Sequence, residues 1–290
     1  MISRPYRSAL YIPGNREGAL NKARNIPTDA IIFDLEDAVA VAEKVSARAT
    51  LVQQLSVGGY GRRTKIVRIN SLETPWGISD IAAVSGTSPD VVLLPKVDTA
   101  KKVLELRFEM SKYESLKKTK IWAMMETPKG VLNAVEIADC SELDGMVMGT
   151  NDLAKDLNVR LDSTRSPLLV ALGLSILAAK AAGIIILDGV FNAFKDDAGL
   201  MLEAVQGRDL GFDGKTLIHP AQVDIVNNAF SPSSTEIELA HRQIEAFNEA
   251  SLNGEGVAVV DGKIVENLHI ETARATIEKS EIILDMESTR

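Results

Sequence analysis

The sequence predicts a (β/α)8 TIM barrel with a C-terminal helical extension. Eight short apolar runs have the length of strands, and helix-length segments separate them. The runs are almost continuously apolar, as expected for parallel strands that are covered on both faces. A length of 290 residues allows either two domains of average size or one barrel of about 250 residues, so length alone does not decide. A doubly wound open sheet is the alternative, but no GxGxxG motif follows the first run.

The expected strands recur from residue 9 to residue 218. They are Ala9–Ile12, Ala30–Leu35, Lys65–Ile69, Val91–Leu94, Ile121–Met125, Gly145–Met148, Gly183–Leu187 and Thr216–Ile218. The clearest helix between them has Ser166 as its N-cap and Pro167 as its first helical residue, and Gly183 ends it. This helix is apolar on almost every side, so it is either deeply packed or part of a subunit contact.

The chain continues beyond the eighth strand. A polar stretch, SPSSTEIE, starts a helix expected over Thr235–Ala250, and turns in NGEG and VVDGK precede a final helix from about Glu271. We therefore expect residues 1–230 to form the catalytic barrel. Residues 231–290 are expected to form an extension, as a lid or an arm that reaches a neighbouring subunit.

Composition excludes several classes of function. The formal charge of −8, from 32 basic and 40 acidic residues, argues against non-specific binding of nucleic acid. No stretch approaches the 18 consecutive apolar residues of a membrane span. The single cysteine, Cys140, forms no intramolecular disulfide, and the N-terminus lacks the apolar run of a signal peptide, so we expect a cytoplasmic location.

Polar residues follow almost every expected strand, at the end of a barrel where active sites lie. They are Pro13-Gly14-Asn15, Glu36-Asp37, Arg68 with Asn70, Pro95-Lys96, Glu126, Asp152, Asp188 and His219-Pro220. Several carboxylates at one mouth repel one another unless a cation neutralises them. Oxygen ligands without a zinc-type His/Cys cluster favour Mg²⁺, with Mn²⁺ as a substitute.

The strongest metal-ligand candidates are Glu126, at the end of IWAMME, and Asp152, in MVMGTNDL. Alternatively, Glu126 is a solvated loop carboxylate and Asp152 a helix N-cap. Arg68, at the end of KIVRI, either balances these charges or binds a substrate carboxylate or a developing oxyanion, and we favour the second role.

Three other groups allow a structural explanation. In PGNREGALNKA, Asn15, Arg16 and Lys22 surround a helix start, which would suit a phosphate, but the residues alone favour a turn and a solvated helix. Glu36-Asp37 also fits a helix cap with a charged first turn. We expect His219 to be a packed or capping residue, because no nucleophile motif accompanies it.

The ordered motifs resemble the citrate lyase β-subunit family, which includes malyl-CoA and citramalyl-CoA lyases of the wider phosphoenolpyruvate/pyruvate barrel superfamily. The resemblance covers roughly residues 5–225 and runs through RSALYIPGN, DLEDAV, VRIN, LPKV, METPKGV, GTNDLAKDL, ILDGV and GKTLIHPAQ. Each motif alone is weak, whereas the series in barrel order is specific.

The resemblance implies a set of roles. Glu126 and Asp152 would bind Mg²⁺, Arg68 would contact the oxygen-bearing end of the substrate, and Glu36 and Asp37 would hold metal-bound waters. The first loop, with Asn15, Arg16 and Lys22, would face the nucleotide of coenzyme A.

The resemblance also implies a shared active site. In the family, the extension carries a Gly-Lys-Met-Ile-Asp motif whose Asp acts in a neighbouring subunit. Here the motif is Gly262-Lys263-Ile264-Val265-Glu266, so Glu266 replaces that Asp. A shared site implies a homo-oligomer, a trimer or hexamer. One additional methylene shifts a carboxyl group by about an ångström, which alters rates by roughly 100-fold.

The resemblance implies a Mg²⁺-dependent carbon–carbon lyase. A 3-hydroxyacyl-CoA such as malyl-CoA or citramalyl-CoA would give acetyl-CoA or propionyl-CoA and a 2-oxo acid, glyoxylate or pyruvate, or the reverse Claisen-type condensation would occur. Arg68 would stabilise the developing charge, and Glu266 would protonate the enolate carbon. Three alternatives stay open: a malyl-CoA-type thioesterase on the same site, a subunit of a citrate lyase complex acting on an acyl carrier protein, and a CoA-binding regulator.

Overall fold

The computed structural model describes residues 4–288, which form two compact units. Tyr6–Phe230 make the first unit, and residues 231–288, with Arg4 and Pro5, make the second. Within the described residues, no helix is long and apolar enough to cross a membrane.

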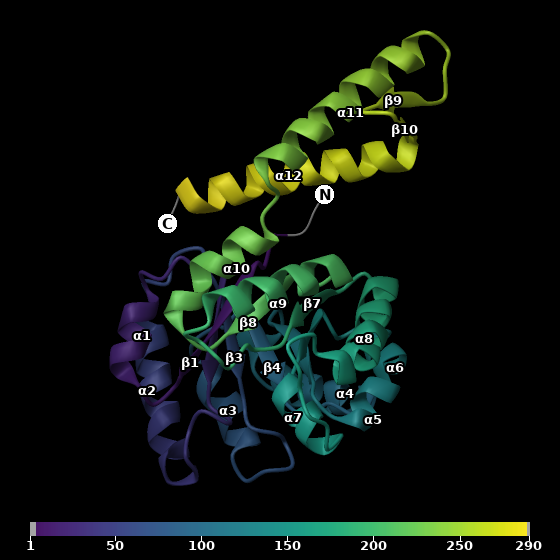
Figure 1. The fold of residues 1–290 in the computed structure, drawn as a ribbon. Helices are drawn as coiled ribbons and strands as arrows, with labels where there is room; N and C mark the ends of the chain where they lie inside the picture. The colour runs from purple at the N-terminus through teal and green to yellow at the C-terminus, as the bar shows by residue number, and fades with distance from the viewer. Residues whose placement is uncertain (1–3, 289–290) are drawn as a thin grey trace. The chain divides into compact units, whose positions relative to one another are not determined.

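The first unit is a closed barrel of eight parallel strands, which confirms the predicted fold class (Figure 1). The strands are β1 (Ser8–Pro13), β2 (Ala30–Asp34), β3 (Thr64–Arg68), β4 (Val91–Leu94), β5 (Lys120–Met125), β6 (Gly145–Met148), β7 (Ile185–Asp188) and β8 (Gly214–Leu217). Each strand pairs with the next, and β1 closes the barrel against β8. Consecutive pairing in chain order is what repeated βα units produce.

Strand side chains alternate between two apolar clusters. One set, which includes Ala9, Ile32, Trp122 and Leu187, fills the barrel interior. The other set, which includes Phe33, packs against the surrounding helices in a larger cluster. Both faces of each strand are thus buried, which explains the almost continuously apolar runs in the sequence.

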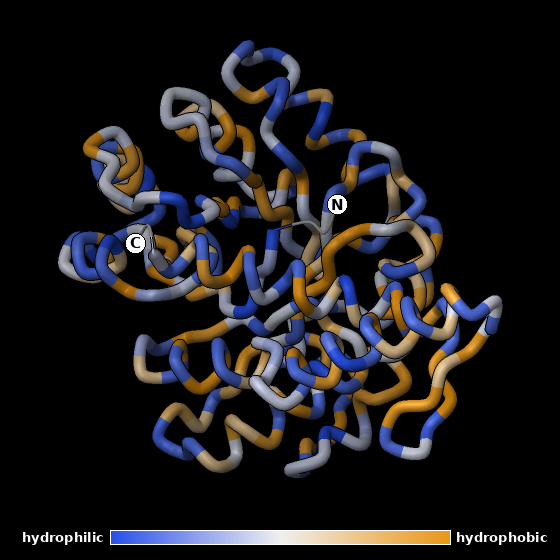
Figure 2. Tube along the Cα trace, turned by 90° about the horizontal axis from the view of Figure 1, so that it is seen from above, coloured by the Kyte–Doolittle hydropathy of each residue, from blue (hydrophilic) through white to orange (hydrophobic). Residues whose placement is uncertain are grey.

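The helices surround the barrel. They are α1 (Glu17–Ala23), α2 (Lys44–Val57), α3 (Gly77–Val84), α4 (Ala100–Ser111), α5 (Pro128–Leu132), α6 (Ala134–Ala138), α7 (Thr150–Asp156), α8 (Leu169–Ala182), α9 (Asp197–Leu210) and α10 (Val223–Phe230). In Figure 2 the trace changes between orange and blue every few residues along the helical coils. That alternation is typical of helices that bury one face.

The start of α8 differs from the prediction. Ser166 is not an N-cap: a short 3-10 turn, Ser166–Leu168, precedes the α-helix, and the Ser166 hydroxyl donates a hydrogen bond to Asp162. Gly183 does end the helix, in the left-handed conformation. One face of α8 packs into the core, while Val170 and Leu177 on the other face are exposed in this chain.

The C-terminal unit is an antiparallel helix pair with a hairpin between the helices (Figure 1). It consists of α11 (Ser234–Leu252), β9 (Ala258–Val260), β10 (Lys263–Val265) and α12 (Asn267–Ser288). A capping box between Ser233 and Glu236 starts α11. The helix α12 starts before the expected Glu271, because its first turn packs Ile270 into the small core of this unit.

Candidate active site

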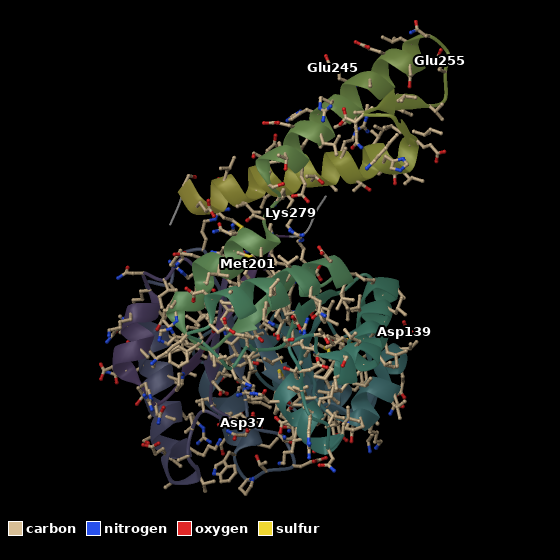
Figure 3. The ribbon with its side chains drawn as sticks, viewed as in Figure 1. Asp37, Asp139, Met201, Glu245, Glu255 and Lys279 are labelled. Carbon is tan, nitrogen blue, oxygen red and sulfur yellow. The ribbon has the colours of Figure 1, made fainter. Side chains whose placement is uncertain are left out.

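A pocket of about 280 Å³ lies at the C-terminal end of the barrel strands. Charged and apolar side chains from most of the strand ends meet in it, among them Tyr11, Asp34, Asp37, Arg68, Met124, Glu126, Asp152, Val190 and Ile218. Figure 3 labels Asp37 among the loops at this end of the barrel. Four predicted site residues therefore line the pocket: Arg68, Glu126, Asp152 and Asp37.

The pocket floor contains a buried ion pair between Asp34 and Arg68. Arg68 Nε and Nη2 donate to the two carboxylate oxygens of Asp34 at 2.7 and 2.6 Å. Asp34 also accepts hydrogen bonds from the amides of Glu36 and Ala38. Burial acts to raise the pKa of Asp34, but Arg68 and these hydrogen bonds outweigh it and lower the pKa. Two of the guanidinium nitrogens thus balance the charge of Asp34, and not that of Glu126 and Asp152 as one of our interpretations proposed.

The third guanidinium nitrogen faces the loop after β2. Arg68 Nη1 lies 3.1 Å from Glu36 and 3.4 Å from Asp37. Burial raises the pKa of Glu36 to about 8, although Arg68 opposes the shift. Lys44 Nζ stabilises this loop, because it donates hydrogen bonds to the carbonyl oxygens of Leu35 and Glu36. Glu36 and Asp37 are therefore fixed beside Arg68 and do not form the helix cap that the sequence also allowed.

Glu126 is almost completely buried just after β5, with 1% of its surface exposed. Its Oε1 accepts a hydrogen bond of 2.7 Å from the backbone amide of Lys96. The backbone of Lys96 is in the left-handed conformation, with φ of 53°. A Cβ at Gly149 would approach Glu126 to 2.3 Å, so only glycine fits there. Burial raises the pKa of Glu126, and the Lys96 amide and Arg68 only partly offset the shift.

Asp152 lies in the first turn of α7, three residues after the N-cap Gly149. It is therefore not the N-cap that the sequence allowed. The ammonium group of Lys96 lies 3.5 Å from its Oδ1. Lys96 thus contacts both predicted metal ligands, one through its backbone amide and the other through its side chain.

The donor set fits Mg²⁺ better than a metal that needs a full protein cage. No group of three or more His, Cys, Asp or Glu side chains within residues 4–288 is arranged to hold a metal ion. Glu126 and Asp152 supply two carboxylates to one open pocket, and only one oxygen of Glu126 is occupied by a backbone amide. Mg²⁺ is commonly held by one or two carboxylates, with water and substrate oxygens completing its octahedron.

The first loop lies outside the pocket lining. The side chain of Asn15 donates to Glu43, while Arg16 and Lys22 are exposed at the start and in the last turn of α1. The Arg16 amide donates to the Pro13 carbonyl and so makes this segment a turn, while the Gly14 amide donates to the Asp34 carbonyl at the end of β2. The structure thus has the turn and exposed helix that the residues alone favoured, and it leaves both cations open to solvent.

Glu266 belongs to the C-terminal unit. It follows β10 directly and is exposed, and its backbone amide donates to Nδ1 of His269. Its carboxylate is not part of the pocket lining.

Two strand ends have structural roles. Asp188 was expected at the mouth, but it is completely buried on the outer side of the barrel, next to Gly207 of α9. There it pairs with Arg165 at 2.7 Å and with Lys215 at 2.9 Å. His219 caps the turn that follows β8, because its Nδ1 accepts the amide of Ala221. The expectation that His219 is a capping residue is confirmed.

The sequence analysis missed Tyr11 and Asp34, which are both part of the pocket. A signal for Asp34 was present, since it ends the apolar run AIIFD two residues after Ile32 and so shares a strand face with it. Tyr11 gave no comparable signal, because an aromatic residue in an apolar run is typical of any strand.

Comparisons with known proteins place the chain among its relatives. The model of the HpcH/HpaI aldolase/citrate lyase family matches residues 7–220. A protein named (3S)-malyl-CoA thioesterase from Cereibacter sphaeroides (strain ATCC 17025 / ATH 2.4.3) is 57% identical over 279 residues, covering 96% of this chain and 96% of its own length. The citrate lyase subunit beta of Escherichia coli (strain K12) is 37% identical over 286 residues, covering 97% and 95% of the two chains.

Solved structures share the fold. CitE from Mycobacterium tuberculosis, in complex with magnesium, acetoacetate and coenzyme A, matches with a TM-score of 0.78 at 30% identity and covers 96% of this chain and 98% of its own. The citrate lyase beta subunit from the same organism, complexed with oxaloacetate and magnesium, matches with a TM-score of 0.68 at 31% identity, covering 79% and 98%. The chain therefore belongs to the HpcH/HpaI aldolase/citrate lyase family.

Proposed function

We propose that this protein is a Mg²⁺-dependent thioesterase that hydrolyses a malyl-CoA-type thioester to the free hydroxy acid and coenzyme A. One observation carries the choice of reaction: the relative named (3S)-malyl-CoA thioesterase is 57% identical across 96% of both chains. The pocket volume of about 280 Å³ suits the acid end of such a substrate. Hydrolysis was the alternative to carbon–carbon cleavage in our sequence analysis.

In this proposal Glu126 and Asp152 hold Mg²⁺. When bound, the cation polarises the substrate oxygens that it contacts. Arg68 binds an oxygen of the acid end through Nη1, because Asp34 already occupies its other two nitrogens. The ion pair with Asp34 fixes the plane of the guanidinium, so Arg68 is oriented before the substrate arrives.

Glu36 and Asp37 hold the attacking water in this proposal. Their carboxylates flank Arg68 Nη1 at the pocket, and a pKa of about 8 suits Glu36 for accepting and returning a proton near neutral pH. Water adds to the thioester carbonyl carbon while its proton passes to Glu36. The carbon–sulfur bond then breaks, and the departing thiolate of coenzyme A takes up a proton.

Coenzyme A extends out of the pocket in this proposal. Arg16 and Lys22, with Asn15 in the same turn, offer two exposed cations to the nucleotide phosphates. Glu266 acts in the site of a neighbouring copy, which requires a homo-oligomer such as a trimer or hexamer. A fully active monomer would contradict the shared site.

Carbon–carbon cleavage is the second candidate, and membership of a family that includes citrate lyase subunits favours it. Mg²⁺ and Arg68 would bind the acid end of the substrate in the same way. In place of water attack on the thioester, Glu266 would protonate the enolate carbon. The two reactions therefore differ in their products and not in how they bind the acid.

Product analysis separates the candidates. We expect malyl-CoA, with citramalyl-CoA as a second substrate, to give free coenzyme A and an intact hydroxy acid when Mg²⁺ is present and nothing when EDTA is added. Mass spectrometry identifies both products, the free coenzyme A and the hydroxy acid. If the products are instead acetyl-CoA and glyoxylate or pyruvate, the protein is a lyase and the proposed hydrolysis is wrong. Turnover only of a thioester on an acyl carrier protein would place the chain in a citrate lyase complex.

Binding of Mg²⁺ is expected to release protons near neutral pH. Burial raises the pKa of Glu126, a proposed ligand, and of Glu36 beside Arg68, and a bound cation would stabilise the ionised form of both carboxyls. Affinity for Mg²⁺ should therefore increase as the pH rises toward about 8, the pKa of Glu36. Calorimetry in buffers with different ionisation enthalpies measures the released protons, and an enthalpy independent of buffer would contradict this linkage.

A further inference from the structure

Tyr11 lies in the active-site pocket, although the proposed reaction has not used it. It is on β1, where alternate residues point into the barrel interior, and its side chain lines the pocket together with Arg68 and Glu126. Its ring lies against the Arg68 guanidinium, 4.8 Å from the ring centroid to Cζ. Tyr11 therefore contacts the group that receives the acid end of the substrate.

The hydroxyl group of Tyr11 has only a weak partner. Within residues 4–288, its one hydrogen bond is to the thioether sulfur of Met124, at 3.5 Å. A thioether is a weak acceptor, so a carboxylate or hydroxyl oxygen of a ligand would be a better partner. Met124 also lines the pocket, so both partners of this weak hydrogen bond belong to the pocket lining.

The surroundings favour a neutral donor at this position. Asp34, Glu36 and Glu126 all lie near Tyr11, so an ionised phenol would be repelled. Burial and these carboxylates raise the pKa of Tyr11, which keeps its proton available for donation throughout the working pH range. A neutral phenol adds a directional hydrogen bond without disturbing the Asp34–Arg68 pair.

We propose that the Tyr11 hydroxyl donates a hydrogen bond to a carboxylate oxygen of the acid end of the substrate, which makes Tyr11 a further substrate-binding residue of the pocket. The acid end reaches Tyr11 because coenzyme A is too large for a pocket of about 280 Å³ and must extend from the mouth. The identity of the acid rests on the proposed function, whereas the hydrogen bond to a small carboxylate does not.

The experiment compares Tyr11→Phe with the unmodified protein in two assays. The first is calorimetric binding of malate or oxaloacetate in the presence of Mg²⁺, and the second is thioester hydrolysis. Phenylalanine keeps the ring on Arg68 and removes only the hydroxyl group. We expect acid binding and kcat/KM to fall by about 10- to 100-fold, as for a lost hydrogen bond to a charged group. The affinity for Mg²⁺ alone should not change.

A matched control is Tyr60→Phe. Tyr60 is also a buried tyrosine packed against an arginine, Arg24, but its hydroxyl donates to the backbone carbonyl of Leu20, and it does not line the pocket. The Tyr60→Phe variant should therefore bind the acid with the same affinity as the unmodified protein. Tyr11→Leu, which also removes the ring from Arg68, should lose more acid affinity than Tyr11→Phe.

The outcomes are distinguishable. Wild-type acid affinity in Tyr11→Phe would overturn the proposal. A parallel loss of Mg²⁺ affinity would also overturn it, because it would show that the hydroxyl supports the structure of the site and not the acid. If the unmodified protein hydrolyses no malyl-CoA, the proposed function fails, while the binding comparison with malate or oxaloacetate still decides the role of Tyr11.

Discussion

Replacing Glu126 by glutamine is expected to reduce Mg²⁺-dependent turnover by at least about 1000-fold, because it removes one of two carboxylates proposed to hold the cation. The protein should nevertheless stay folded. Burial raises the pKa of Glu126, so its ionised form lowers the stability of the metal-free protein at neutral pH. Glutamine removes that charge and still offers an oxygen to the Lys96 amide.

Two measurements separate lost chemistry from lost structure. The melting temperature without metal should not fall in Glu126→Gln, and the increase in melting temperature that Mg²⁺ causes in the unmodified protein should disappear. Glu114→Gln is a suitable control, since this carboxylate is largely exposed and pairs with Lys117 at the surface. Normal Mg²⁺-dependent turnover in Glu126→Gln would contradict the proposal that Glu126 binds the metal.

Replacing Asp188 by asparagine should lower the free energy of unfolding by about 3–5 kcal/mol. Asp188 and Lys215 are both completely buried, and Arg165 is 3% exposed, so the variant leaves two buried cations without their shared carboxylate. Glu203, 2.7 Å from Lys215, compensates for one of them at most. Denaturation by urea, followed by circular dichroism, measures the loss.

The pH dependence provides an internal check on Asp188. Burial acts to raise its pKa, but Lys215 and Arg165 outweigh burial and lower it. Its stabilisation is therefore complete above the unfolded-state value of about 4 and is lost as the pH falls through the lower folded-state value. The difference between the variant and the unmodified protein should shrink in acid.

A surface ion pair gives the matching control for Asp188→Asn. Asp209→Asn breaks the exposed contact with Arg208, the preceding residue of α9, and should cost less than about 1 kcal/mol. Equal losses in the two variants would contradict the importance of burial for the Asp188 pair.

The barrel could be predicted from the sequence because its strands are buried on both faces. Parallel strands of this kind are short apolar runs, and eight of them separated by helices leave few other topologies. The predicted ends of the strands differ from the observed ends by at most two residues. The start of α8 was missed because a proline near a helix start fits a 3-10 turn as well as an α-helix.

The candidate site was only partly predictable, because a residue at a strand end faces either the pocket or the helices. Asp34 and Asp188 each end a strand, yet Asp34 continues the inward set of Ile32, whereas Asp188 follows the inward Leu187 and so points outward. The direction depends on the register of each strand in the closed barrel, which a single run of apolar residues does not reveal.

The position of Lys96 has a consequence for how the protein is assembled and controlled. Its ammonium group, 3.5 Å from Asp152, is a built-in counterion for carboxylates that would otherwise repel each other. We therefore expect the polypeptide to fold without an inorganic ion and to bind Mg²⁺ afterwards. The fraction of molecules that carry the cation would then follow the free Mg²⁺ concentration of their surroundings.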